Sequence, residues 1–183
     1  MKQLIFKILK KAGLRIIRIK KGFHYVHKIY GISSHKMRDI RADPLFHSLA
    51  KPVVRSGKTS LYYDRLYHLF QGFQNITNNN PAHEKINVAD IGTYRGGSTY
   101  FLAATALRLA PGRVELWSID TFEGYSAQDL PHGIEGSYLV PGKGGDVDFD
   151  EVIKYLSPFK FVKIIKSRIQ DCAQALRDTK FHL

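Results

Sequence analysis

Short apolar runs alternate with amphipathic segments over the second half of the chain. The runs, each of strand length, cover residues 86–91, 114–119 and 160–166. Segments with apolar side chains at helical spacing cover residues 99–109, 151–156 and 169–177. Such an alternation predicts parallel strands joined by right-handed crossovers. The pattern therefore predicts an α/β fold with a partial Rossmann-like, doubly wound parallel sheet of βαβαβα order, preceded by a helical N-terminal region.

The chain before the first predicted strand divides into several regions. Residues 42–57, which contain Pro44 and Pro52, have the composition of a connector. Residues 59–73 have helical spacing and predict a helix that covers the sheet and ends at the polar run 75–81. The predicted domains are a basic amphipathic arm at 1–41, a helical connector and cap at 42–85, and a partial sheet domain at 86–183.

Positive charge is concentrated in the arm. The whole chain carries a net charge of +12, and residues 1–41 hold twelve Lys or Arg against Asp39 alone, which accounts for +11. Residues 1–12 place apolar side chains on one helical side and lysines on the other. This pattern fits binding to an anionic membrane surface, and it fits docking of the arm on the rest of the protein or on a partner equally well. Both interpretations stay open, and nucleic-acid binding is the least favoured of the three.

The composition of the chain limits the cellular compartments in which we expect the protein. Apolar residues make up 44% and charged residues 24% of the chain, which is typical of a globular protein. Cys172 is the single cysteine, which excludes a disulfide within the chain and suits a reducing compartment. Lys7, Lys10 and Lys11 interrupt the one segment that resembles a secretory signal, and no run approaches the ~20 apolar residues of a membrane span. We expect a cytoplasmic protein, peripheral on the inner face of the membrane through its arm.

A glycine-rich turn follows the first predicted strand, in the segment Asp90-Ile-Gly-Thr-Tyr-Arg-Gly-Gly-Ser98. Glycine lets the backbone turn tightly and approach a ligand, and the helix that follows directs unpaired N–H groups toward the same place. Asp120 follows the second apolar run, where its carboxylate can accept hydrogen bonds from ribose hydroxyls. Together these features predict a nucleoside pocket, and a purely structural turn is the alternative. The glycine spacing departs from Gly-x-Gly-x-x-Gly, which disfavours a nicotinamide dinucleotide.

A long loop separates the second predicted strand from the next helix. Residues 121–150 exceed an ordinary connection and contain six glycines, which favours a substrate lid. His132 lies in this loop and is a weak candidate for a catalytic base, because most loop histidines are simply solvated.

The acidic residues at 146, 148 and 150 begin like a calcium-binding loop. The glycine and glutamate that such a loop needs at its sixth and twelfth positions are replaced by Glu151 and Ser157, so we expect no metal site there. Asp150 is instead expected to cap a helix that begins at Glu151.

The ends of the first two strands resemble those of a known family. The segments Asp90–Ser98 and Leu116-Trp-Ser-Ile-Asp-Thr-Phe-Glu-Gly124 are similar to class I S-adenosylmethionine-dependent methyltransferases, in particular the macrocin O-methyltransferase (TylF-like) group that modifies sugars. Arg65-Leu-Tyr-His-Leu69 resembles part of the helix that those proteins place before the first strand. The resemblance covers roughly residues 55–183, and its motifs are specific in combination and weak singly.

The resemblance implies a role for each matching residue. Asp90 would order the turn or contact the methionine end of S-adenosylmethionine. The residues that would line the cofactor are Gly92, Tyr94, Gly96, Gly97 and Ser98. Asp120 would bind the ribose hydroxyls, with Thr121 and Phe122 beside the adenosine. After the third strand, the residues that would meet the adenine edge are Ile169, Gln170 and Asp171. For Gln170 and Asp171, a helix start with a capping carboxylate is the alternative.

The sequence departs from the family pattern at Lys180-Phe-His-Leu183, where the relatives' fourth strand begins. Beyond this point relatives carry a His-x-Asp-x-Asp-like motif, which supplies an acidic metal ligand and neighbouring catalytic groups. The divalent-metal ligands of the full-length family are therefore absent from this sequence, and no catalytic residue is assigned. We expect a fragment that self-associates through an exposed apolar edge of its first strand.

These observations predict the cofactor-binding N-terminal part of an enzyme that transfers a methyl group to a hydroxyl of a sugar or glycan. The acceptor would be a small molecule or a glycan. The rival interpretation is a nucleoside-binding pseudoenzyme, or a membrane-surface interaction module, without catalysis. A nicotinamide-linked enzyme is a third interpretation, which the glycine spacing disfavours.

Overall fold

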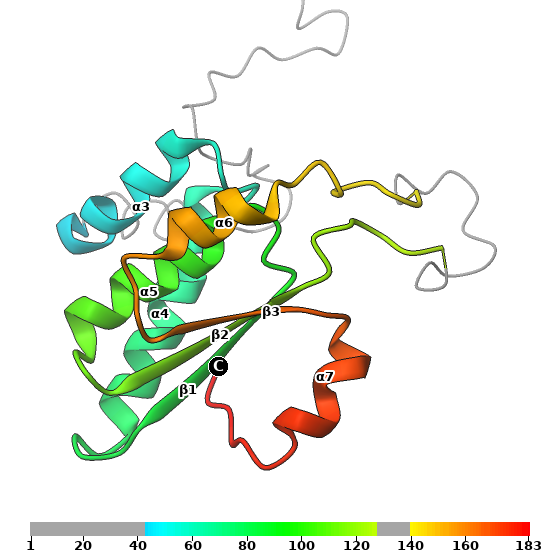
Figure 1. The fold of residues 1–183 in the computed structure, drawn as a ribbon. Coiled ribbons are helices and arrows are strands. Elements are labelled where there is room, and N and C mark those ends of the chain that lie inside the picture. Colours follow the sequence, from blue (N-terminus) through cyan, green and yellow to red (C-terminus); the bar gives the residue numbers. More distant parts are fainter. Residues whose placement is uncertain (1–42, 128–139) are drawn as a thin grey trace, which may run out of the picture.

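The structure is a computed structural model that describes residues 43–127 and 140–183 (Figure 1). The predicted basic arm at 1–41 and His132 lie outside the described residues. Three strands form one sheet, with bounds β1 Ile86–Ile91, β2 Val114–Asp120 and β3 Val162–Lys166. They are parallel and lie in the order β1-β2-β3, so the predicted α/β class with a parallel sheet is confirmed.

Helices cover both faces of this sheet (Figure 1). The helices that follow the strands are α5 Gly97–Leu109, α6 Phe149–Leu156 and α7 Ile169–Leu176. On one face, Val88 and Leu116 pack against Leu102 and Ala106 of α5. On the other face, Ile119 packs against Cys172 and Leu176 of α7. This two-sided packing follows from the strand sequences, in which both alternating sets of side chains are largely apolar.

Residues 44–56, within the predicted helical connector and cap at 42–85, form a helix, α3 Pro44–Ser56, which the composition of residues 42–57 did not indicate. Asp43 caps this helix, because its Oδ1 accepts a hydrogen bond from the Phe46 amide at 2.8 Å. Pro44 stands in the first turn, where a missing N–H costs nothing. Pro52 removes one helical hydrogen bond on the exposed side, and the burial of Phe46 and its neighbours offsets that loss.

The helix before the sheet, α4 Tyr63–Asn79, begins and ends later than the sequence indicated. At its start, Thr59 Oγ1 accepts the Leu61 amide at 3.0 Å, which fixes a local turn in place of the first helical turn. At its end, the Asn80 side chain donates to the Ile76 carbonyl at 2.8 Å. The polar run at 75–81 therefore continues and caps the helix.

A second apolar cluster joins α3, α4 and α5 into one layer. Phe46, Phe70 and Phe101 come one from each helix, and all three are fully buried. Their rings meet edge-on or tilted, with Phe46 at 5.7 Å from Phe70 and at 6.0 Å from Phe101, centroid to centroid. This layer fixes the start of α5, and with it the glycine turn.

The last residues of the chain lie beside β1. The His182 amide donates to the Asn87 carbonyl at 2.9 Å, and the Ala89 amide donates to the Leu183 carbonyl at 2.8 Å. Figure 1 shows the C-terminus next to this strand. β1 therefore lies between β2 and residues 182–183. These two residues form hydrogen bonds with part of the β1 edge that we expected to be exposed. In the ranges 43–127 and 140–183, no helix has both the length and the apolarity to cross a bilayer.

Candidate functional site

The glycine turn after β1 and the carboxylate at the end of β2 meet at one place. Asp120 Oδ2 accepts the Tyr94 amide at 2.7 Å, and its Oδ1 accepts the Phe122 amide at 2.8 Å. The Gly92 amide donates to the Ile119 carbonyl at 2.9 Å, which joins the same two chain segments. The predicted juxtaposition of turn and carboxylate is thus present, and Asp120 holds both loops in position.

Asp90 orders the first turn of α5. Its Oδ2 accepts hydrogen bonds from Ser98 Oγ at 2.8 Å and from Thr99 Oγ1 at 2.5 Å. Burial raises the pKa of Asp90 above its usual value; the two hydroxyl donors act in the opposite direction, and the charge of Asp120 adds to the rise. Of the two roles expected for Asp90, this geometry fits the ordering of the turn.

A cluster of three buried hydroxyls lies beneath the turn, and sequence reasoning missed it. Thr93 Oγ1 is 2.7 Å from Ser118 Oγ, and Thr99 Oγ1 is 3.1 Å from the same atom. The three side chains are almost completely buried, at 2% exposure or less. The only signal was the presence of small hydroxyl residues at positions that the periodicity assigns to the interior. The cluster joins β2 to the turn through hydrogen bonds that water cannot reach.

The three glycines of the turn have different surroundings. Gly92 has φ 85°, and among the described residues no atom lies within 4 Å of a Cβ built on it, so only Gly92 leaves open space at the strand end. Gly96 has φ 84° and packs against α6, where such a Cβ would lie 3.3 Å from Tyr155. A Cβ on Gly97 would lie 2.5 Å from the Thr59 Cβ, so Gly97 permits close packing with the α3–α4 connection. Gly96 and Gly97 are buried and serve packing.

Two non-glycine residues next to Asp120 have left-handed backbones. Tyr94 has φ 53° and Phe122 has φ 57°, and in both residues the amide is bonded to the Asp120 carboxylate. Such conformations cost about 1 kcal/mol or more each, and they persist where the surroundings hold them. The Phe122 ring is buried against α6 and lies 4.8 Å from the Phe149 ring, centroid to centroid, so only its backbone faces Asp120.

The end of β3 comes beside Asp120 through the Ser167 amide, which donates to the Asp120 carbonyl at 2.9 Å. Ile169 begins α7 and packs in the cluster beneath that helix, while Gln170 and Asp171 are exposed in its first turn. These two residues therefore lie at the start of a helix, as the alternative interpretation predicted. The N-cap residue is Arg168, so the predicted capping by a carboxylate is wrong. The Thr121 side chain forms a hydrogen bond within its own loop, since its Oγ1 accepts the Glu123 amide at 3.2 Å.

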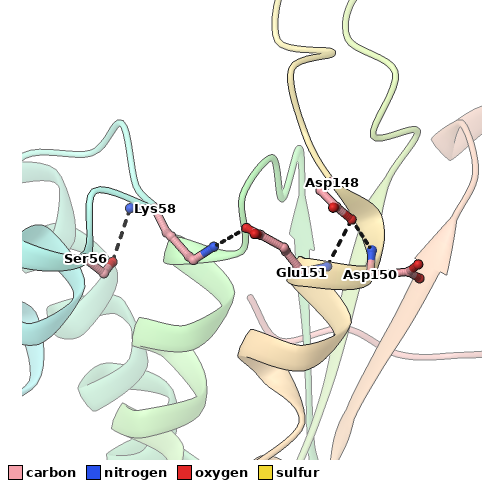
Figure 2. Close-up of polar contacts among 5 residues, drawn as sticks. All are labelled: Ser56, Lys58, Asp148, Asp150 and Glu151. Carbon is pink, nitrogen blue, oxygen red and sulfur yellow. Dashed lines mark hydrogen bonds and ion pairs between the residues drawn. The ribbon is translucent and has the colours of Figure 1, made fainter.

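A polar pocket of about 330 Å³ lies next to the turn. The sequence did not predict that its lining residues lie together. Its lining comes from the α3–α4 connection, the turn and the start of α6, and comprises Ser56, Gly57, Lys58, Arg95, Asp146, Val147, Asp148, Glu151 and Val152. Lys58 Nζ lies 3.1 Å from Glu151 Oε2 across it (Figure 2). Arg95 forms an ion pair with Asp146.

The pocket wall at α6 is set by Asp148. Its Oδ1 accepts the amides of Asp150 and Glu151, at 2.9 Å and 3.2 Å (Figure 2). Asp148 is therefore the helix cap, and the expectation that Asp150 has this role is wrong by two residues, because α6 begins at Phe149. The Asp150 carboxylate points away from Lys58 (Figure 2).

Asp146 fastens the exit of the long loop to the turn. Its Oδ1 accepts the Tyr94 hydroxyl at 3.1 Å, and the Arg95 guanidinium lies 5.0 Å from the Tyr94 ring centroid. The Tyr94 hydrogen bond and the Arg95 charge lower the pKa of Asp146. Burial and the bond to Asp146 raise the pKa of Tyr94. Through Asp146 the loop contacts the same turn that Asp120 holds.

The two described ends of this loop are held together. The Tyr125 amide donates to the Lys143 carbonyl at 3.1 Å, and the Gly142 amide donates to the Tyr125 carbonyl at 2.8 Å. Gly124 and Gly145 are in backbone contact, since a Cβ on Gly124 would lie 2.6 Å from the Gly145 nitrogen. The predicted substrate lid stays a prediction, since part of the loop lies outside the described residues.

Within residues 43–127 and 140–183, no group of three or more His, Cys, Asp or Glu side chains is arranged to hold a metal ion. Comparisons with family models, with curated proteins and with solved structures each found no match.

Proposed function

We propose that this chain is the cofactor-binding part of an S-adenosylmethionine-dependent methyltransferase, built on a partial Rossmann-like sheet. The transfer we propose is to a hydroxyl oxygen of a sugar or glycan. The observation that carries the proposal is the 2.7 Å bond between the Tyr94 amide and Asp120 Oδ2, because it unites the turn and the strand-end carboxylate in one site. Ligands of open α/β sheets bind at the carboxyl ends of the strands, where these groups lie.

The residues present fit a nucleoside. A carboxylate has about four lone-pair positions, and the two backbone amides occupy two of those on Asp120, which leaves acceptors for a ribose diol. Gly92 leaves open space beside it, and the Ser167 contact brings the end of β3 to the same place. When bound, the sulfonium nucleoside supplies an electrophilic methyl group, and the contribution of these residues is to hold it in a fixed orientation.

Activation of the acceptor is a separate requirement. A sugar hydroxyl is a weak nucleophile at neutral pH and needs a general base or a metal ion before it attacks the methyl group. The described residues assign no group to this role. We therefore attribute donor binding to this chain, and we propose binding of the arm to an anionic membrane surface, at the cytoplasmic face, as a separate property.

Isothermal titration tests the proposal. We expect the chain to bind S-adenosylhomocysteine and S-adenosylmethionine and to give no heat with NAD. Asp120→Ala should weaken S-adenosylhomocysteine binding by at least about tenfold, because it removes a charged acceptor from two ribose hydroxyls. Asp178→Ala, which removes the same charge from a side chain that is 97% exposed, is the control.

The outcomes separate the interpretations. Equal affinities in the Asp120 and Asp178 variants would refute the proposed site. Nucleoside binding without methyl transfer to a glycan pool would favour the pseudoenzyme. Binding of NAD in place of the methyl donor would favour a nicotinamide-linked enzyme.

A further inference from the structure

The three parallel strands begin at one side of the molecule, and the long loop leaves from the other side (Figure 1). A basic residue stands shortly before each strand, Lys85 before β1, Arg113 before β2 and Lys160 before β3. The first two are neighbours in the sheet, because Ile86 pairs with Val114. We call this side the strand-start face, and it comprises Leu107 and residues 82–85, 108–115 and 158–163.

Positive charge predominates on the strand-start face, which contains five Lys or Arg against two Glu. One of these acidic residues, Glu115, faces two lysines, with its carboxylate 3.6 Å from Lys85 Nζ and 2.9 Å from Lys163 Nζ. The Arg113 guanidinium donates to the Pro81 carbonyl at 2.7 Å. That acceptor is neutral, so the bond leaves the charge of Arg113 uncompensated.

An apolar depression of about 80 Å³ lies in the same face. Its lining residues are Ala106, Leu107, Ala110, Gly112, Val114 and Phe161. Small-molecule sites span roughly 300–1,000 Å³, so the depression is too small to be one. Leu107 is 50% exposed beside it, and Arg108 follows in the last turn of α5. The face therefore combines an exposed apolar side chain with surrounding cations.

This combination selects one kind of partner. At an anionic lipid surface an apolar side chain reaches the acyl boundary, while Lys and Arg meet lipid phosphates. A second copy of the chain, docked through the same face, would bring like charges together. A nucleic acid would supply phosphates for the cations but no apolar surroundings for Leu107.

We propose that the strand-start face binds an anionic lipid surface, with Leu107 at the acyl boundary and Arg108 and Lys160 at lipid phosphates. The inference goes beyond the proposed binding of the arm, because it assigns a membrane contact to the described part of the protein. It also orients the molecule. The carboxyl ends of the strands, where the proposed nucleoside site lies, face away from the bilayer.

A single fluorescent label tests the contact directly. In a Cys172→Ala background, Leu107→Cys or Val140→Cys provides one thiol for an environment-sensitive nitrobenzoxadiazole label. Val140 is 51% exposed, which matches Leu107, but it belongs to the long loop. On vesicles of phosphatidylcholine and phosphatidylserine, we expect the emission of the label at residue 107 to shift to the blue. The label at residue 140 should emit as it does in buffer.

Sedimentation of the full-length chain with the same vesicles measures the strength of the contact. We expect Leu107→Asn, Arg108→Gln and Lys160→Gln each to weaken binding about fivefold, because each removes one apolar or cationic contact with the surface. The matched controls are Val140→Asn and Lys143→Gln, which change exposed side chains of the long loop. Binding of both controls should equal that of the unaltered chain.

The results separate this inference from the arm and from the proposed function. If the chain binds vesicles while the label at residue 107 keeps its emission in buffer, the arm alone makes the contact and the inference is overturned. It is also overturned if the chain binds no vesicles, or if the long-loop labels and variants respond as strongly. S-adenosylhomocysteine affinity should be the same in all these variants, so its absence would count against the proposed function alone.

Discussion

Replacing Gly97 by alanine tests the packing that holds the turn. Gly97 is the first residue of α5 and is buried. A Cβ there would lie 2.5 Å from the Thr59 Cβ and 2.6 Å from the Lys58 carbonyl oxygen. The second contact is with backbone, so no side-chain rotation relieves it, and the α3–α4 connection must move away from the turn.

The expected cost follows from this contact. Overpacking a buried site destabilises a protein by about 1–3 kcal/mol, and the helix propensity of alanine returns less than about 1 kcal/mol at a helix start. We expect Gly97→Ala to lower the free energy of unfolding by about 2 kcal/mol, which corresponds to a melting temperature about 4–8 °C lower in a chain of this size. Thermal and urea unfolding followed by circular dichroism measure both quantities.

Gly72→Ala is the matched control. Gly72 lies inside α4, and a Cβ there would meet only the end of the Leu183 side chain among the described residues, at 3.4 Å. Alanine should stabilise this helix interior by up to about 1 kcal/mol. A Gly97→Ala protein as stable as the unaltered one, or a Gly72→Ala protein that loses as much stability, would refute the packing argument.

Two further changes test the interior of the site. Thr99→Val keeps the side-chain shape but removes a hydroxyl from the buried cluster with Ser118; we expect a loss of about 1–3 kcal/mol in urea unfolding, whereas Thr105→Val should cost less, because that hydroxyl bonds only a carbonyl of its own helix. Asp90→Asn tests the raised pKa of Asp90. A carboxyl whose pKa is higher in the folded state than in the unfolded state favours folding increasingly as the pH falls from neutrality toward 3.8, the usual pKa of an aspartate. The free energy of unfolding of the unaltered protein should therefore rise relative to that of the variant over that pH range. A difference between the two unfolding free energies that stays constant with pH would contradict the assignment.

The sequence predicted the parts of the fold that depend on local pattern. The three strands, the helices after them and the meeting of the glycine turn with Asp120 follow from apolar periodicity and from the rule that parallel strands end at one edge. The identity of the α6 cap required the exact start of the helix, which periodicity locates only to within a few residues. Asp148 and Asp150 were indistinguishable on that basis.

The features that the sequence did not predict depend on contacts between distant segments. The Lys58–Glu151 pair and the packing of Gly97 against Thr59 arise only when the α3–α4 connection docks on the turn. The helix α3 was missed for a different reason. Two prolines indicated a connector, but one lies in the first turn and the other on the exposed side, where the buried face outweighs the lost bond.

The contact between Gly124 and Gly145 has a consequence for the engineering of this protein. The hydrogen bonds between Tyr125 and residues 142–143 hold the two ends of the loop together. The strands of the sheet therefore do not depend on the length of the segment between residues 127 and 140. A foreign peptide inserted between these positions should leave the register of β1, β2 and β3 unchanged, provided that Gly124 and Gly145 are kept.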